Sequence, residues 1–105
     1  FLNSKLSNHC ISFKDLKISE TLPIIKNCNL YIGNDTGWLH ISAALGIKSL
    51  ALFMDSPVQA YGKYSKNIEV IVPDGETEET TTHDTLGADK ISFEKVFNES
   101  IKLLN

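Results

Sequence analysis

The feature that most constrains the fold is the run Ser49 to Met54, SLALFM, in which polar and apolar residues do not alternate. A strand with one face in water alternates in polarity, whereas a strand covered on both faces is apolar throughout. Ile68 to Val72 is another largely apolar run, and Asn29 to Ile32 is a shorter one that stops at Gly33. The sequence therefore predicts short strands that need helices on both sides of their sheet.

Helical patterns separate these runs. Ile18 to Asn27 and Thr36 to Leu45 carry apolar residues at helical spacing, and Gly46 is of the residue type that commonly ends a helix. The pattern also predicts short β character at His9 to Phe13. Ser92 to Leu104 predicts a last helix with one apolar stripe, formed by Phe93, Val96, Phe97, Ile101 and Leu104. Helices that alternate with buried strands predict the α/β class, with a partial Rossmann-like parallel sheet and flanking helices.

Length and charge limit what the chain can do. Its 105 residues form one domain at most, and its net charge of −3 argues against a nucleic-acid partner, which needs a basic surface. No run approaches the ~20 apolar residues that cross a bilayer, and the polar start of the chain does not resemble a secretory leader. Cys10 and Cys28 have no paired spacing, which fits reduced thiols in a cytoplasmic protein.

The composition changes at residues 75–90, GETEETTTHDTLGADK, which we expect to form a polar surface loop. Side chains of metal-binding type occur there without rigid spacing, so we expect no metal site; they are Glu76, Glu78, Glu79, His83 and Asp84. Neither GxGxxG nor GxxxxGK[ST] occurs, which argues against a dinucleotide dehydrogenase or a P-loop ATPase. Tyr61 and Tyr64 could edge a pocket, but we expect both to serve in packing.

The stretch GNDTGWLH lies where a buried strand is predicted to become a helix. Ligands of parallel α/β sheets bind beyond the carboxyl ends of the strands. A helix start also offers unpaired amides and the positive end of the helix dipole, which favour an anion. Gly37 has no Cβ to keep a phosphate away from the backbone, and His40 follows Thr36 by one turn, so both face the same side. The alternative is a capped helix without a ligand, in which Asp35 or Thr36 is the cap.

The segment NLYIGNDTGWLHISAALGIKSLALF resembles the C-terminal signature of glycosyltransferase family 9, the heptosyltransferases. In that signature an apolar strand leads into an Asn-Asp-Thr-Gly turn and a histidine, followed by Ala-Ala-Leu-Gly and a strand that ends in Ala-Leu-Phe. These parts occur here in the same order, and the resemblance covers about residues 18–104. Trp38 stands where the family usually has proline, and Met54 to Pro57 replaces its usual Gly-Pro-Thr-Asp-Pro loop.

The resemblance implies a GT-B enzyme with two facing Rossmann-like domains, of which residues 1–105 would be a single, incomplete nucleotide-sugar-binding domain. The nucleotide-diphospho-sugar, commonly ADP-heptose, would be a substrate, and no cofactor is implied. By the same resemblance, Thr36 and Gly37 would bind the donor diphosphate, while Asp35 and His40 would sit at the phosphate and sugar. Leu16 to Ile18 would lie near the base. Candidates for the edge of the donor pocket are Asn34, Leu16, Lys17, Ile18, Trp38 and Met54.

The expected whole enzyme transfers a heptose-like sugar to lipopolysaccharide or another glycan, at the inner face of a bacterial inner membrane. Its catalytic base would belong to an N-terminal acceptor-binding domain upstream of this sequence, so no catalytic residue is assigned here and the chain alone is expected to be inactive. Without upstream strands, an exposed sheet edge would allow self-association. Two alternatives remain open: a non-catalytic α/β module that binds an anion or a protein, and a GT-B enzyme that uses a UDP-sugar.

Overall fold

The computed structural model describes residues 8–82 and 90–105 of the chain. Three strands, β1 (Tyr31–Asn34), β2 (Ser49–Leu52) and β3 (Ile68–Ile71), form a parallel sheet in the order β1-β2-β3 within this part of the chain. The helices are α2 (Ile18–Lys26), α3 (Gly37–Ala44), α4 (Val58–Tyr61) and α5 (Phe93–Leu104). The predicted α/β class, with a parallel sheet flanked by helices, is confirmed.

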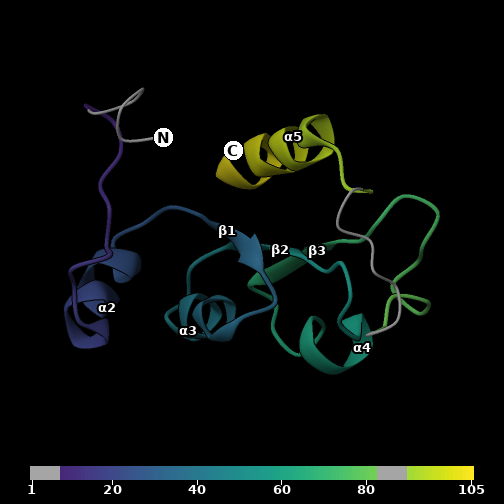
Figure 1. Ribbon diagram of the computed structural model, residues 1–105, viewed down its shortest axis with the longest axis horizontal. Coiled ribbons are helices and arrows are strands. Elements are labelled where there is room, and N and C mark those ends of the chain that lie inside the picture. Colours follow the sequence, from purple (N-terminus) through teal and green to yellow (C-terminus); the bar gives the residue numbers. More distant parts are fainter. Residues whose placement is uncertain (1–7, 83–89) are drawn as a thin grey trace.

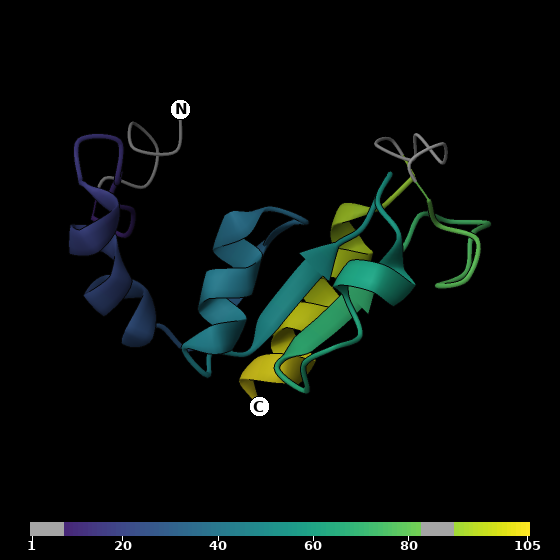
Figure 2. The ribbon, with the colours of Figure 1, turned by 90° about the horizontal axis from the view of Figure 1, so that it is seen from below.

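The helices lie in two layers around the sheet. Helices α3 and α4 cover one face, and α5 crosses the opposite face (Figures 1 and 2). Helix α2 lies beyond α3, away from the sheet, and is joined to the rest of the chain at the start of β1. The sheet and its three nearest helices therefore form one packed body, with α2 beside it.

The core lies between β2 and the α3–α4 layer. Leu39, Phe53 and Val58 have no exposed surface, and they pack with Ala43, Ala51 and Ile68. Ser49, Leu50 and Ala51 are all buried, as the lack of polar alternation in this run predicts for a strand covered on both faces. Full burial of a side chain as large as that of Leu39, Phe53 or Val58 contributes about 1.5–3 kcal/mol to the free energy of unfolding.

The element boundaries follow the sequence closely. Helix α3 begins after Thr36 and ends before Gly46, whose φ of +83° suits a residue without a Cβ. Strand β1 begins two positions later than predicted and continues to Asn34, because its residues pair in register with Ser49 to Leu52. The short helix α4 forms a single helical turn in the segment after β2.

One prediction, about the start of the chain, is wrong. His9 to Phe13 forms no strand, and Ile11 is 85% exposed, because no neighbouring strand lies alongside to pair with this segment. The predicted last helix is confirmed as α5, but its apolar stripe is not its buried side: Phe93 is 77% exposed and Phe97 is 53% exposed. The least exposed side of α5 instead carries buried Ser100, whose hydroxyl donates to the Val96 carbonyl within the helix.

The described part of the polar loop is held by local hydrogen bonds. The Thr80 hydroxyl donates to Glu76 Oε2 at 2.6 Å, and the Thr81 hydroxyl donates to the Thr77 carbonyl at 2.8 Å. His83 and Asp84 lie outside the described residues. Within the described ranges, no cluster of three metal-binding side chains is present, and no helix has the length and apolar character to span a membrane.

Candidate functional site

The predicted anion-binding turn lies at the carboxyl end of β1. Thr36 is the N-cap of α3 in an extended conformation, with φ −139° and ψ 171°, and its side chain makes no capping hydrogen bond. Within the described residues, the amides of Gly37 and Trp38 have no hydrogen-bond partner. A Cβ built on Gly37 would meet nothing within 4 Å. The start of α3 therefore presents two donors and an open approach to its backbone.

Asp35 and His40 are joined to each other and to Tyr64. His40 Nε2 lies 3.0 Å from Asp35 Oδ1, and His40 Nδ1 lies 2.5 Å from the hydroxyl oxygen of Tyr64. The His40 and Tyr64 rings are also stacked, with their centroids 5.6 Å apart. Both ring nitrogens of His40 are thus occupied by the protein's own side chains. A direct hydrogen bond from His40 to a ligand requires one of these partners to leave.

Tyr64 reaches His40 from the segment between α4 and β3. Gly62 allows this segment to pack closely on the core, because an added Cβ would lie 2.9 Å from Val70 Cγ2 and 3.2 Å from Phe53 Cζ. We expected Tyr64 to serve in packing, but this residue is 60% exposed and contacts His40. No local pattern could have paired Tyr64 with His40, because 24 residues separate them in the chain.

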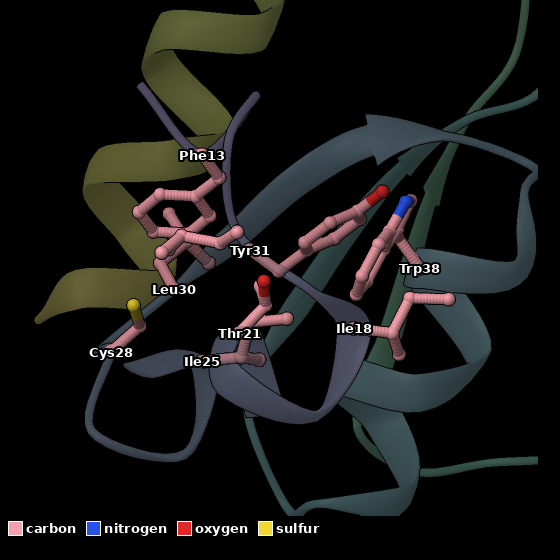
Figure 3. Close-up of a pocket in the computed structure, with 9 residues that line it drawn as sticks. Phe13, Ile18, Thr21, Ile25, Cys28, Leu30, Tyr31 and Trp38 are labelled. Carbon is pink, nitrogen blue, oxygen red and sulfur yellow. The ribbon is translucent and has the colours of Figure 1, made fainter. Parts of the chain in front are cut away.

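An apolar cavity of about 440 Å³ lies between α2 and the start of α3 (Figure 3). The rings of Tyr31 and Trp38 lie on one side of it, and Phe13 and Leu30 lie at its other end. Gly33 makes room for the Tyr31 ring, because a Cβ on Gly33 would overlap the Tyr31 hydroxyl. The lining residues are Phe13, Leu16, Ile18, Thr21, Ile25, Cys28, Leu30, Tyr31 and Trp38.

This cavity brings together three of the six residues considered for the edge of a donor pocket, namely Leu16, Ile18 and Trp38. The other three do not line it: Lys17 precedes α2, Asn34 ends β1, and Met54 follows β2. Trp38 is the second residue of α3 and its amide is one of the open donors. The cavity and the open helix start are therefore adjacent parts of one surface.

The family model described as Glycosyltransferase family 9 (heptosyltransferase) matches residues 14–90. That range contains the open helix start, the His40 cluster and every residue that lines the cavity except Phe13. Neither the curated proteins nor the solved structures gave a match.

Proposed function

Because the chain belongs to glycosyltransferase family 9, a family of GT-B glycosyltransferases, we propose that it binds the nucleotide-diphospho-sugar donor of such an enzyme. The diphosphate would lie at the start of α3, against the amides of Gly37 and Trp38. The base would enter the apolar cavity beside it. The observation that carries this proposal is the adjacency of the two features, which share Trp38.

The open helix start supports the diphosphate position. Unpaired amides and the positive end of the helix dipole favour negative charge, by about 0.3–2 kcal/mol for each favourable interaction. The Asp35 carboxylate would repel a phosphate, but it is held on the His40 ring at 3.0 Å. The amides of Gly37 and Trp38 are therefore open to a phosphate, whereas the Asp35 carboxylate is already paired with His40.

The cavity supports the base position. Tyr31 and Trp38 offer aromatic faces, on which a flat heterocycle stacks. Burial of ~100 Å² of apolar surface contributes about 2.5 kcal/mol. Added to the helix-start term, this gives affinity in the millimolar range, which corresponds to about −4 kcal/mol. The isolated chain should therefore bind the donor weakly, and we expect it to transfer no sugar.

In the intact enzyme, this surface would serve the transfer of a heptose-like sugar to lipopolysaccharide or a related glycan. A base from an acceptor-binding domain would deprotonate the acceptor hydroxyl, which would attack the anomeric carbon with inversion. The amides at the start of α3 would stabilise the departing nucleoside diphosphate as its charge grows. Such a reaction would take place in the cytoplasm, at the inner face of the inner membrane.

The test is a titration of the isotope-labelled chain, followed by amide chemical shifts. ADP, pyrophosphate and adenosine are the probes, because they separate the diphosphate position from the base position. Pyrophosphate should shift the amides of Gly37 and Trp38, adenosine should shift residues around the cavity, and ADP should shift both sets with higher affinity than either part. UDP in place of ADP tests the alternative of a UDP-sugar donor.

The sharpest variant is Gly37→Ala. The added methyl group meets nothing within 4 Å in the free chain, and alanine is favoured over glycine in a helix by about 0.5–1 kcal/mol. The variant should therefore fold at least as well as the wild type while its methyl group blocks the approach of phosphate. ADP and pyrophosphate should bind several-fold more weakly, with adenosine binding unchanged. Equal binding of all polyanions by both proteins would favour the non-catalytic anion-binding module instead.

A further inference from the structure

We infer that Tyr64 is the member of the Asp35–His40–Tyr64 cluster that meets the ligand, and that its hydroxyl oxygen accepts a hydrogen bond from a sugar hydroxyl. Asp35 and His40 act through Tyr64, as positioning residues that fix its proton. This inference rests on the proposed function, because it takes the donor diphosphate to lie at the adjacent start of α3.

Exposure increases along the cluster in one direction. The side chain of Asp35 is 15% exposed, that of His40 is 36% exposed, and Tyr64 is 60% exposed. Both ring nitrogens of His40 are occupied. Tyr64 is therefore the outermost member, and its oxygen is the polar atom of the cluster that most readily reaches a molecule outside the protein.

The hydrogen-bond chemistry fixes the direction of the protons. An ionised carboxylate only accepts, so a neutral His40 ring in this contact carries its proton on Nε2 and donates it to Asp35. His40 Nδ1 is then an acceptor, and the Tyr64 hydroxyl donates to it. With its own proton turned toward His40, the Tyr64 oxygen offers only lone pairs to a ligand. Such an oxygen suits the hydroxyl of a sugar and repels the oxygens of a phosphate.

The segment that carries Tyr64 is anchored against α3. The Asn67 side-chain amide donates to the Ala43 carbonyl at 3.0 Å, and the Asn67 carbonyl accepts from the Ser49 amide at 2.7 Å. Ala43 lies almost one helical turn after His40, so the two contacts lie along the same side of α3. The contact with His40, the fourth residue of α3, then places the Tyr64 hydroxyl beside the first turn of this helix, near the end where the diphosphate would bind.

The experiment compares ADP with ADP-glucose on the wild-type chain, on Tyr64→Phe and on the control Tyr61→Phe. Tyr61 is an exposed tyrosine of the same region whose hydroxyl has no hydrogen bond among the described residues. Tyr64→Phe should weaken ADP-glucose binding by about three- to tenfold, the effect of one hydrogen bond, and leave ADP binding unchanged. Tyr61→Phe should change neither.

The possible results distinguish failure of this inference from failure of the proposed function. If Tyr64→Phe weakens ADP and ADP-glucose equally, or weakens neither, the inference is overturned while the proposed function stands. If the wild-type chain binds neither nucleotide, the proposed function fails and the inference falls with it. His40→Ala combined with Tyr64→Phe should be no worse for ADP-glucose than Tyr64→Phe alone, because His40 acts through the tyrosine. Additive losses would instead show that His40 touches the sugar itself.

Discussion

The body formed by the sheet with α3 and α4 differs sharply from α2 in how it is held together. Around β2, the side chains of Leu50, Ala51 and Phe53 have no exposed surface. In α2, only Thr21 and Ile25 are buried, and Ile18 is 64% exposed. Pro23 also lies inside α2 and cannot donate a backbone hydrogen bond to the preceding turn. The sheet with α3 and α4 is stabilised by a packed core, whereas α2 is held mainly by its covalent connection to β1 and by a few contacts.

The candidate site lies across the boundary between these two parts. The amides for a diphosphate belong to α3, which packs on the sheet through buried Leu39 and Ala43. The cavity for a base is closed on one side by α2. This arrangement would suit a nucleoside diphosphate. The diphosphate would bind amides on the well-packed helix α3, and the less tightly held α2 would enclose the base.

The largest expected effect comes from Phe53→Ala, at the centre of the core. Removal of a fully buried phenylalanine leaves a cavity and lowers the free energy of unfolding by about 3–5 kcal/mol. Urea denaturation followed by circular dichroism measures this loss. Because the whole domain has a stability of only about 5–15 kcal/mol, Phe53→Leu provides a milder second variant that should still fold.

Phe97→Ala is the matched control for that change. Phe97 lies on α5, is 53% exposed and stacks on Phe93 with ring centroids 6.0 Å apart. Its removal should lower the free energy of unfolding by about 1 kcal/mol or less. Equal losses at Phe53 and Phe97 would contradict the division between a packed core and an exposed apolar stripe.

The core could be predicted from the sequence wherever a single residue pattern determined the local structure. SLALFM predicted a strand covered on both faces, which β2 confirms, and the turn after β1 followed from Gly33, Thr36 and Gly37 in sequence. The orientation of α5 was not predictable, because Phe93 and Phe97 are more hydrophobic than the Ser100 that is buried instead. Tertiary contacts decide such cases, and a single sequence contains no direct record of them.

The same limit applies to the site. Spacing on one helix predicted that Thr36 and His40 face one side, the missing Cβ pointed to Gly37, and the resemblance implied a place for Asp35 beside them. The contact between His40 and Tyr64 depends on the path of the segment after α4 along α3. Gly62 allows this segment to pack closely on the core, and Asn67 bonds it to α3. The strand predicted at His9 to Phe13 failed for a related reason, since a strand forms only where a partner edge is available. That residues 1–105 form a single, incomplete domain stays a prediction.

A second, smaller effect is expected at the buried pair of serines. Ser42 Oγ and Ser49 Oγ lie 2.7 Å apart, and neither side chain has exposed surface. Ser49→Ala leaves the Ile47 carbonyl without the hydroxyl that donates to it at 2.9 Å, and should lower the free energy of unfolding by about 1–3 kcal/mol. Urea denaturation of the single variants and of Ser42→Ala/Ser49→Ala tests the pair. A double variant that loses the full sum of both singles would show that the two hydroxyls act independently.

The smallest expected effect concerns α2, and hydrogen exchange measures it directly. In the free chain, the amides of β2 should exchange most slowly and those of α2 among the fastest, because α2 can open without disrupting the core. If a nucleotide base fills the cavity against Ile18 and Tyr31, ADP at ten times its dissociation constant should stabilise the bound form by about 1.4 kcal/mol. Protection should then rise in α2 and at the start of α3 while β2, already limited by global unfolding, gains no more than this amount. Pyrophosphate, which leaves the cavity empty, should protect the start of α3 but not α2. If pyrophosphate protected α2 as strongly as ADP does, α2 would be responding to charge at the helix start, and the cavity would have no part in holding the base.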